Sequence, residues 1–500
     1  MKTRTTFILF LTAIITIAAG SAFGKYSGGT GDPNNPYQIL TPDDMNAIGA
    51  NSSDWSKCFI LMADVDMSIY TGTQYHIIGD FRGTFDGNGH VIQNLNYSST
   101  TAVTNIGLFG SATNATIKNL GLEDINLSVS GPFVGGLAGQ LNNCTVTNCY
   151  STGTITDSYS SNELYAGGLT GYQNNGTINE CHSAGTIVAT MPSTSYYWSV
   201  YAGGLVGQQY TGTINYCYSS ASVTAISVHD NAYAGGLVGY QPANICNITN
   251  SYSTGAVSAI GSPTVYAGGL VGYRVSMTNS LTNDCYSTGK VTASSTSWYA
   301  YAGGLIGYLS APITNCYSKG DVNSFGKITS TGGLIGCATY ATLTQCYSAG
   351  EMNVIATSTA YTGGSVGYRD DYSFANGCFW DTNTSGQSTA SGNYYNDGIT
   401  GETTAEMKTR STFTDAGWDF ANIWAICEVT NYPRLRWAIP AADFVCPDGI
   451  DFADYSFFAE RWLNTNCASN YNCNGADFDL SGTVDMADLE IFCDYWLKGF

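Results

Sequence analysis

The sequence carries little charge, and most of the charge that it carries is negative. Only 11% of its 500 residues are charged, and 17 Lys and Arg stand against 37 Asp and Glu, which leaves a net charge of −20. A chain of this charge is repelled by nucleic acid and by anionic membranes, so neither is an expected partner. After the first 19 residues, no stretch is long and apolar enough to span a bilayer, which takes roughly 20 apolar residues. We therefore expect no transmembrane segment in the mature chain.

Histidine is also scarce, which limits the catalytic and metal chemistry that the chain can support. No His-Glu-x-x-His motif occurs, so zinc peptidase chemistry is not expected. The segment 363–367 matches the Gly-x-Ser-x-Gly nucleophile pattern, but it lacks the strand-to-helix context of such nucleophiles. The four histidines show no ligand spacing; they are His76, His90, His182 and His229. The sequence thus contains no clear catalytic motif and favours a protein that is not an enzyme.

The first 24 residues have the pattern of a secretory signal. Lys2 and Arg4 precede an apolar run over 7–19, and small residues lead to the Ala-Phe-Gly segment 22–24. A short basic region, about a dozen apolar residues and small residues at a cleavage site are typical of such signals. We therefore predict a signal peptide over 1–24 and a secreted, extracellular protein, either soluble or attached to the cell surface.

Glycine and tyrosine are abundant instead, with 59 Gly and 36 Tyr, and they recur in an internal repeat. The motif Tyr-Ala-Gly-Gly-Leu-(Val/Ile)-Gly appears at 201–207, 233–239, 266–272 and 301–307. With its variants included, the central position recurs in steps of 29 to 36 residues, at Leu108, Leu137, Leu169, Leu205, Leu237, Leu270, Leu305, Leu334 and Ser365. After most copies comes a second motif, Asn-Cys-Tyr-Ser-(Thr/Lys)-Gly or a close variant. Self-similarity at a nearly fixed period is the sequence signature of a repeat architecture.

Each repeat holds two or three expected strands of about four to six residues, separated by glycines. Such a unit is too small to bury its own apolar face, so successive units are expected to stack. Equivalent side chains then form ladders inside the stack, and the strands pair in parallel between coils. The helical runs that an α-solenoid needs are missing from 106–378. The predicted fold class is all-β, a parallel β-helix (β-solenoid) of about nine to eleven coils.

The repeat resembles the GLUG family, named for Gly-Leu-bulky-Gly, which is found in bacterial surface proteins and in some immunoglobulin-cleaving peptidases. The resemblance covers 106–378 in nine copies. The flanks also look familiar from that family, with Asp-Pro-Asn-Asn-Pro-Tyr-Gln-Ile at 32–39 and Gly-Trp-Asp-Phe at 417–420. We therefore expect an N-terminal cap with the first coils over 25–105 and a C-terminal cap over 379–440. Open solenoid ends expose strand edges, and caps prevent edge-to-edge association.

Sixteen cysteines in a secreted chain suggest disulfide bridges. Seven share one repeat position, at which Ser251 stands in one further copy: Cys149, Cys181, Cys217, Cys285, Cys316, Cys346 and Cys378. Stacked about 4.8 Å apart, they are interpreted as a ladder of buried small hydrophobic side chains. Disulfides between adjacent coils are the alternative, and the shortage of histidine argues against a metal ladder. Better disulfide candidates, which can pair in three ways, are Cys446, Cys467, Cys473 and Cys493.

Residues 441–500, called the tail below, differ from the rest of the chain in charge and in pattern. They hold eleven acidic residues against Arg461 and Lys498, and their apolar residues recur at helical spacing. They also contain a duplication, because 451–463 is repeated as 485–497. The tail is therefore expected to be a separate, small α-helical domain.

The segment 477–488, which leads into the second copy, fits an EF-hand-type calcium loop. Such a loop carries oxygen ligands at positions 1, 3, 5, 7, 9 and 12 and a glycine at position 6. Calcium is a hard cation that takes six to eight oxygen ligands, so a charge-dense loop suits it. The predicted ligands are the side chains of Asp477, Asp479 and Ser481, the carbonyl of Thr483, Asp485 directly or through water, and Asp488. The sequence therefore predicts a calcium site in the tail.

The loop–helix duplication resembles a type I dockerin module, a small domain that docks enzymes or surface proteins to cohesin partners. The resemblance implies a dockerin-like calcium-binding domain, with a cohesin-like protein or a cell-surface component as its partner. The first loop, 443–454, departs from the pattern because Val445 and Pro447 take ligand positions 3 and 5. This loop is expected to bind calcium weakly or not at all. The partner-reading positions are also atypical, since Phe452-Ala453 and Met486-Ala487 replace the hydroxyl residues common there.

Acidic residues near the first coils are the best candidates for an active site. A pair of carboxylates can act as acid and base in a polysaccharide hydrolase or lyase, and the candidates are Asp64, Asp66, Asp80 and Asp86. The competing interpretation, which we favour, is that these residues cap turns and strand ends.

Aromatic residues in the variable loops suggest a role in binding carbohydrates without cleaving them. Tyr196-Tyr197-Trp198 and Trp298-Tyr299 can stack on sugars, although loop aromatics more often cover the solenoid surface. Together, the patterns predict an extracellular scaffold or adhesion protein that contacts glycans and docks through a calcium-binding tail. The alternative is a polysaccharide-degrading β-helix enzyme that the tail delivers to a surface complex.

Overall fold

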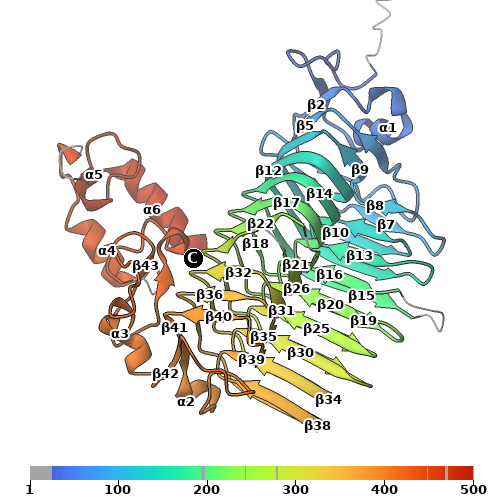
Figure 1. Ribbon diagram of the computed structural model, residues 1–500. Helices are drawn as coiled ribbons and strands as arrows, with labels where there is room; N and C mark the ends of the chain where they lie inside the picture. The colour runs from blue at the N-terminus through green and yellow to red at the C-terminus, as the bar shows by residue number, and fades with distance from the viewer. Residues whose placement is uncertain are drawn as a thin grey trace, which may run out of the picture.

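Figure 1 shows the computed structural model, which describes residues 25–192, 198–242, 244–276, 280–446, 449–467 and 471–498. The predicted signal peptide over 1–24 lies outside these residues. Most of the described chain winds into one long stack of parallel strands. After the last coil the chain turns back, so that the C-terminal helices lie beside the stack rather than at its end (Figure 1).

Each turn of the stack contains up to five short strand segments, and these line up with their counterparts in neighbouring turns as five columns. The first column is β8 (Asn105–Ile106), β11 (Phe133–Gly135), β13 (Leu164–Gly167), β16 (Val200–Gly203), β20 (Ala232–Gly235), β25 (Thr264–Gly268), β30 (Tyr299–Gly303) and the second halves of β34 (Val322–Gly332) and β38 (Met352–Gly363). The second is β4 (Ile78–Phe81), β9 (Phe109–Thr113), the first parts of β12 (Ala138–Ser158), β14 (Thr170–Asn179) and β17 (Val206–Asn215), and then β21 (Val238–Gln241), β26 (Val271–Val275), β31 (Ile306–Ser310), β35 (Ile335–Ala338) and β39 (Val366–Arg369).

The other three columns complete each turn. The third is β1 (Tyr37–Ile39), β2 (Cys58–Leu61), β5 (Thr84–Asp86), the start of β10 (Thr116–Val129), later parts of β12, β14 and β17, and β22 (Cys246–Thr249), β27 (Thr282–Asn283), β32 (Pro312–Thr314), β36 (Thr342–Thr344) and β40 (Phe374–Asn376). The fourth is β3 (Val65–Asp66), β6 (Val91–Gln93), the middle of β10 and of β12, the start of β15 (His182–Met191), and β18 (Tyr218–Ser219), β23 (Tyr252–Ser253), β28 (Tyr286–Ser287), β33 (Tyr317–Ser318), β37 (Tyr347–Ser348), β41 (Cys378–Asp381) and β42 (Ile399–Glu402). The fifth is β7 (Asn96–Ser98), the ends of β10, β12 and β15, β19 (Ser222–Ser227), β24 (Val257–Gly261), β29 (Val291–Ser295) and the first halves of β34 and β38.

The copies of the repeat stack in register. Tyr165 pairs with Tyr201, and the same position continues in parallel register through Tyr233, Tyr266 and Tyr301. This confirms the predicted parallel β-solenoid, which has about nine turns. The expectation of two or three strands per unit was too low, because corners divide each turn into as many as five segments.

Two glycines of the repeat are needed because the chain passes very close to its own neighbouring turns. A Cβ atom on Gly235 would lie 1.8 Å from the Val238 carbonyl oxygen, and one on Gly236 would lie 1.9 Å from the Gly269 carbonyl oxygen. The Ser253 hydroxyl donates to that same Gly269 carbonyl, so no space is left for a side chain. Only a residue without a Cβ atom fits at these positions.

Aliphatic side chains fill the interior of the solenoid. The central Leu of the repeat is completely buried in every copy that has one, as Leu137, Leu237 and Leu305 illustrate. Burying a Leu side chain stabilises a fold by roughly 1.5–3 kcal/mol, and the repeat supplies one in nearly every turn. Ser365, which takes this position in the last copy, is buried too. Its hydroxyl therefore lies in the core and not at a surface where a nucleophile would meet a substrate.

The seven stacked cysteines are buried free thiols, and they do more than fill space. The Cys217 thiol donates to the Asn215 carbonyl at 3.2 Å and accepts the Cys181 N–H at 3.4 Å. In the next turn, the Ser251 hydroxyl donates to the Thr249 carbonyl at 2.7 Å and accepts the Cys217 N–H at 3.1 Å. The interpretation as small hydrophobic residues was therefore incomplete. The position needs a short side chain that both donates and accepts, which is why serine can replace cysteine.

Short helices occur at both ends of the described chain. Near the N-terminus, α1 begins with a capping box formed by Thr41 and Asp44. The helices and 3₁₀ turns are α1 (Pro42–Ala50), η1 (Ser52–Asp54), α2 (Thr382–Ser385), η2 (Glu406–Lys408), α3 (Arg410–Thr414), η3 (Arg436–Ala438), α4 (Phe452–Ala459), α5 (Tyr471–Asn474) and α6 (Met486–Lys498). A small antiparallel pair, β43 (Trp424–Ala425) and β44 (Arg434–Leu435), lies between α3 and η3.

Residues 379–440, called the cap below, add the last strands of the fourth column through β41 and β42 and then pack along the side of earlier coils. The aromatic cluster that they share with the solenoid contains Tyr317, Tyr347, Phe379, Met407, Phe413, Trp418, Phe420, Trp424 and Leu435. Hydrogen bonds fix this contact, since the Tyr347 hydroxyl donates to the Pro433 carbonyl at 2.7 Å and Trp437 Nε1 donates to the Asp284 carbonyl at 3.0 Å. The cap is thus attached to solenoid residues far away in the sequence.

The tail has a small core of its own, formed by Ala442, Phe458, Cys467, Cys473, Ala476, Val484 and Phe492. Helices α4 and α6, one from each copy of the duplication, both contribute to it. In the described part of the chain, no helix is long and apolar enough to cross a membrane.

Candidate functional site

Loop 477–488 of the tail brings three carboxylates together. Oxygen atoms of Asp477, Asp479 and Asp488 all lie within 4.8 Å of one another. Asp477 and Asp488 are buried, with 2% and 0% of their surface exposed, whereas Asp479 is exposed. Among the described residues, this is the only group of three or more His, Cys, Asp or Glu side chains spaced to hold a metal ion.

Backbone N–H groups position Asp488 at the centre of this loop. Its Oδ1 accepts the N–H groups of Phe478 at 2.6 Å and Asp479 at 3.2 Å, and its Oδ2 accepts the N–H of Asp485 at 2.9 Å. These bonds fold the start of the loop back onto the first turn of α6. A carboxylate offers about four lone-pair sites, so Asp488 keeps the capacity for a further partner.

The other two carboxylates differ in how they are held. Asp477 Oδ2 accepts the Gly482 N–H at 3.0 Å, but its Oδ1 is buried without a hydrogen-bond partner. Hydrogen bonds from the backbone and side chain of Ser481 lower the pKa of Asp479. A buried oxygen that lacks a partner and points into an acidic loop is the feature that a bound cation would satisfy.

The remaining predicted ligands lie on the same loop but outside the carboxylate group. The Ser481 hydroxyl donates to the Thr483 carbonyl at 3.2 Å. Asp485 caps α6, because its Oδ1 accepts the Ala487 N–H at 2.9 Å. The structure therefore brings Asp477, Asp479 and Asp488 together and places the other three predicted ligands around them.

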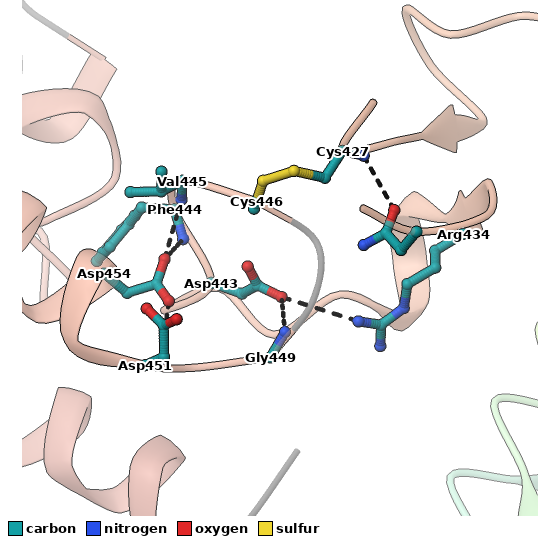
Figure 2. A network of polar contacts seen from close by, with 10 residues as sticks. Cys427, Arg434, Asp443, Phe444, Val445, Cys446, Gly449, Asp451 and Asp454 are labelled. Atoms are coloured by element: carbon teal, nitrogen blue, oxygen red, sulfur yellow. Dashed lines mark hydrogen bonds and ion pairs between the residues drawn. A yellow bond between two sulfur atoms is a disulfide. The ribbon is translucent and has the colours of Figure 1, made fainter. Parts of the chain in front are cut away.

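The first loop, 443–454, has a closely similar framework. Asp454 Oδ1 accepts the N–H groups of Phe444 at 2.6 Å and Val445 at 2.9 Å, and Asp443 Oδ2 accepts the Gly449 N–H at 3.1 Å (Figure 2). Unlike the second loop, it has a salt bridge to the cap, because Arg434 Nη1 lies 4.0 Å from Asp443 Oδ2. Pro447, at ligand position 5, lies outside the described residues.

The disulfides correct the expectation that the tail cysteines pair with one another. Cys467 does pair with Cys473, but Cys446 pairs with Cys427 of the cap, and Cys493 is an exposed free thiol. The physical reason is the folding back of the cap, which brings Cys427 to within 5.3 Å of Cys446 between Cα atoms. Sequence reasoning missed Cys427 and Arg434, because nothing in the local sequence marks them as neighbours of the first loop.

A second candidate site lies along a ladder of aromatic rings, one from each turn. The rings stack with centroids 4.6 to 4.9 Å apart, in the order Tyr150, His182, Tyr218, Tyr252, Tyr286, Tyr317 and Tyr347. Because each ring stacks face to face on its neighbours, the ladder presents mainly ring edges to its surroundings. The aromatic residue, usually tyrosine, that follows the repeat cysteine is the sequence signal that could have found it.

A cleft of about 610 Å³ opens where solenoid, cap and tail meet this ladder. Trp437 of the cap lies against the ladder, with its ring centroid 6.2 Å from those of Tyr252 and Tyr286. Tyr216, which is 47% exposed, lies edge-on to Trp437 at 6.0 Å, and Tyr495 of α6 also lines the cleft. Aromatic side chains with hydroxyl groups at the rim are typical of small-ligand sites.

The aromatic loop residues named from the sequence do not form a common site. Tyr196 and Tyr197 lie outside the described residues, and Trp198 is 39% exposed. Trp298 is 47% exposed, but the ammonium group of Lys327 lies 4.0 Å from its ring centroid and covers one face.

Among the four N-terminal carboxylates, Asp64 and Asp66 act as turn and ladder residues. Asp64 accepts the Val91 N–H at 3.1 Å and lies 3.1 Å from His90 Nδ1. These two contacts, the Val91 N–H first, lower the pKa of Asp64. Asp66 accepts the side-chain amide of Asn94 at 3.0 Å, and this bond is the main cause of its lowered pKa. Both carboxylates thus bridge neighbouring turns.

Asp80 and Asp86 lie on different strand columns and form separate ion pairs. Asp80 accepts the guanidinium Nε of Arg82 at 2.8 Å, whereas Asp86 lies 3.0 Å from Lys118 Nζ. Burial pushes the pKa of Asp86 up, but hydrogen bonds, among them that from Lys118, outweigh it and leave this pKa lowered. A lowered pKa suits Asp86 as a partner in an ion pair and not as a general acid.

A comparison with protein families identifies the repeat. The model of the GLUG motif matches residues 134–156, 199–224, 230–258 and 299–323. The chain carries GLUG repeats. The matched segments make up about a fifth of the sequence, and each contains a strand of the first column with the strands that follow it. The match identifies the repeat unit and does not extend to the cap or the tail.

Two curated proteins share part of this sequence. Halomucin of Haloquadratum walsbyi is 33% identical over 151 residues, which is 27% of this chain but only 2% of halomucin. A protein of Evansella cellulosilytica, provisionally named a Gly-rich membrane protein, is 34% identical over 157 residues, which is 31% of this chain and 14% of that protein. The alignments therefore cover a small part of each relative.

One solved structure is similar in part: a protein of Bacteroides ovatus that is provisionally named an immunoglobulin A1 protease. The alignment covers 83% of this chain and 96% of that one, at 19% sequence identity and a TM-score of 0.37. These values are too low to support conclusions about fold or activity.

Proposed function

We propose that the chain is a secreted or cell-surface β-solenoid that serves as an extracellular scaffold or adhesion protein. The tail acts as a dockerin-like, calcium-binding module that docks the solenoid to a partner. The regular stack supports the first part, because successive turns repeat the same contacts and present a long, mostly polar surface of turns and loops. The relatives named above as a halomucin and a Gly-rich membrane protein point to the same extracellular setting.

One observation carries the calcium proposal. Asp477 Oδ1 is buried without a hydrogen-bond partner, and a carboxylate oxygen of Asp477 lies within 4.8 Å of oxygens of Asp479 and Asp488. Like charges at this spacing repel one another unless a cation neutralises them. Oxygen-only donors in a short loop before a helix suit calcium better than a softer metal. The residues that would hold the ion are those named above, from Asp477 to Asp488.

Calorimetric titration of the full chain with calcium tests this proposal. Saturable binding is expected for the natural protein, and Asp479→Asn should weaken it by at least about tenfold, because it removes one charged ligand. Asp494→Asn, which changes an exposed carboxylate on α6 outside the loop, is the matched control and should bind normally. Equal binding by both variants would contradict the site.

The docking surface is proposed to lie where the two copies of the duplication present apolar residues. Phe452 at the start of α4 and Met486 at the start of α6 are 79% and 66% exposed. Large exposed apolar side chains at equivalent positions are typical of a partner surface. A cohesin-like protein or a cell-surface component is the expected partner.

Binding of the full chain to immobilised cohesin domains, with and without calcium, tests the docking proposal. Calcium-dependent binding that is lost in Phe452→Asp and Met486→Asp is the expected result. Glu460→Gln, at a polar residue beyond the C-terminal end of α4 whose side chain is 75% exposed, is the control and should bind normally. Loss of binding in the control alone would place the surface elsewhere.

Glycan binding is a second candidate function, and the aromatic cleft favours it. Sugars present flat apolar faces with polar rims, which match aromatic rings flanked by hydroxyl groups. Trp437 and Tyr216 lie outside the stacked ladder, so the faces of their rings are not covered by face-to-face stacking within it. A glycan array should lose its signals with Trp437→Ala and keep them with Trp298→Ala; the reverse result would move the site to the loop.

The alternative of a polysaccharide-degrading enzyme loses support at its best candidates. Asp80 is paired with Arg82, and Asp86 is paired with Lys118. Asp64 and Asp66 bridge neighbouring turns through hydrogen bonds. An assay of soluble product release from the glycans that bind in the array decides between scaffold and enzyme.

A further inference from the structure

We propose that the two loops of the tail have separate tasks: loop 443–454 fastens the tail to the cap of the same chain, and loop 477–488 alone takes calcium. The fastening part stands on contacts of the first loop. The calcium part rests on the calcium site proposed above.

The two loops share one backbone framework, so their differences are meaningful. In each loop, the carboxylate at position 12 accepts the N–H groups of positions 2, 3 and 9: Asp454 does so in the first loop and Asp488 in the second. In each, the aspartate at position 1 accepts a glycine N–H, at 3.1 Å for Asp443 and 3.0 Å for Asp477. The same framework is therefore present in both loops.

The first loop takes its positive charge from the protein. Arg434 Nη1 lies 4.0 Å from Asp443 Oδ2, and the side chain of Asp443 is fully buried. In the view of Figure 2, Arg434 and Asp454 lie on opposite sides of Asp443, so the guanidinium group reaches the aspartate from the cap. Within the described residues, no ion pair reaches the equivalent Asp477 of the second loop.

Position 3 shows the same division. In the second loop it is Asp479, which belongs to the carboxylate group. In the first loop it is Val445, which has no side-chain oxygen, and the next residue, Cys446, forms the disulfide with Cys427 of the cap. A residue that would ligate calcium is thus replaced next to a covalent link to the cap.

Together, these contacts connect the tail to the solenoid without a metal ion. The disulfide and the Arg434–Asp443 ion pair join the first loop to the cap. The cap in turn is tied to the solenoid through Tyr347 and Trp437. Two links from one loop also restrict rotation more than either link alone. The tail should therefore stay mounted on the solenoid at low calcium, while its second loop responds to the ion.

Native mass spectrometry of the full chain in calcium tests the division of tasks. One calcium ion per chain is expected, and Asp479→Asn should need at least about tenfold more calcium to take it up, although the first loop is unchanged in that variant. Two ions on the natural protein, or one ion on Asp479→Asn at the same calcium concentration that loads the natural protein, would overturn the proposal. No ion on the natural protein would refute the calcium site itself, and the fastening part would then be decided by the next experiment.

Limited proteolysis between cap and tail tests the fastening. The double variant Cys427→Ser/Arg434→Gln should release the tail roughly tenfold faster than the natural protein, because cleavage follows the population of the open state. It should still bind one calcium ion. Arg410→Gln changes an exposed cap arginine whose ring contact, Phe420, lies within the cap, and it should be cleaved at the natural rate. An unchanged rate in the double variant, or loss of its calcium, would overturn the proposal. Circular dichroism of the solenoid confirms that each variant is folded.

Discussion

The solenoid and the tail of this chain are stabilised in opposite ways. In the solenoid, the same contacts recur from turn to turn. Glycines lie close to backbone carbonyl groups, leucines fill the core, and cysteines form hydrogen bonds at the corners. In the tail, each contact occurs once or twice, and its two loops have diverged even though their backbones match. The comparison shows that repetition makes a region predictable from sequence and tolerant of small side-chain changes, whereas a unique site depends on single residues.

The largest loss of stability is expected from a substitution at a repeat glycine that has no space for a side chain. Gly236→Ala would place its Cβ atom 1.9 Å from the Gly269 carbonyl oxygen. We expect a loss of about 3 kcal/mol or more in the free energy of unfolding, measured by urea denaturation. Gly326→Ala is the matched control, because its Cβ atom would meet nothing closer than 3.3 Å. Its loss should stay below about 1 kcal/mol. Similar losses in both variants would mean that close packing of turns does not limit the solenoid.

Removal of calcium should affect the thermal stability of the tail but not that of the solenoid. If calcium is present at 100 times its dissociation constant, it stabilises the folded tail by about 2.7 kcal/mol. Chelation, or Asp477→Asn, should therefore lower the melting temperature of the tail and leave that of the solenoid unchanged. Differential scanning calorimetry follows both transitions. A shift of the solenoid transition would show that the two regions unfold as one unit.

The aromatic ladder gives the solenoid a response to alkaline pH. Burial raises the pKa of Tyr252 to about 12 from the ordinary value of 10.0. A raised pKa in the folded state means that the unfolded chain loses its proton first, so this contribution is complete below pH 10 and is lost as the pH rises toward 12. The raised pKa of Tyr252 corresponds to at most about 3 kcal/mol of stability. Urea denaturation at pH 9 to 12, with phenolate absorbance recorded in parallel, measures it. Exposed tyrosines outside the ladder form phenolate near pH 10 in any case, so Tyr252→Phe serves as the comparison. If this variant loses absorbance near pH 10 in the folded protein, the burial of the ladder is contradicted.

The smallest effects belong to the cysteine column. Cys217→Ser should cost less than about 1 kcal/mol, because Ser251 already makes the same two hydrogen bonds in the next turn. Cys217→Val puts a somewhat larger, apolar side chain at this position and leaves the Cys181 N–H without its acceptor, and should cost about 1–3 kcal/mol. If valine were tolerated better than serine, the column would be a simple hydrophobic ladder after all.

The same comparison explains what could be predicted from the sequence. Tyr201 and Tyr233 stand in identical heptapeptides, so their stacking followed from the period alone. The carboxylate group at Asp477, Asp479 and Asp488 was also accessible, because a calcium loop is a local pattern. The two hydrogen bonds of Cys217 at its corner could not be predicted from the sequence, because they depend on the turn above and the turn below.

The contacts that join the cap to the tail and to the solenoid could not be predicted from the sequence. Cys427 and Cys446 are 19 residues apart, and Trp437 meets Asp284 across more than 150 residues. Such pairs occur once, so no period marks them, and they depend on how the chain turns back after its last coil. The predicted pairing of Cys446 with another tail cysteine was wrong for this reason.

Hydrogen–deuterium exchange of the full chain, with and without calcium, tests the central claim most directly. Chelation should speed exchange in 471–498, with loop 477–488 most affected, while the solenoid over 106–378 exchanges at an unchanged rate. The Asp443–Asp454 segment should keep most of its protection, because the cap holds it. Faster exchange throughout the solenoid, or no change in loop 477–488, would contradict a scaffold whose calcium response is confined to its tail.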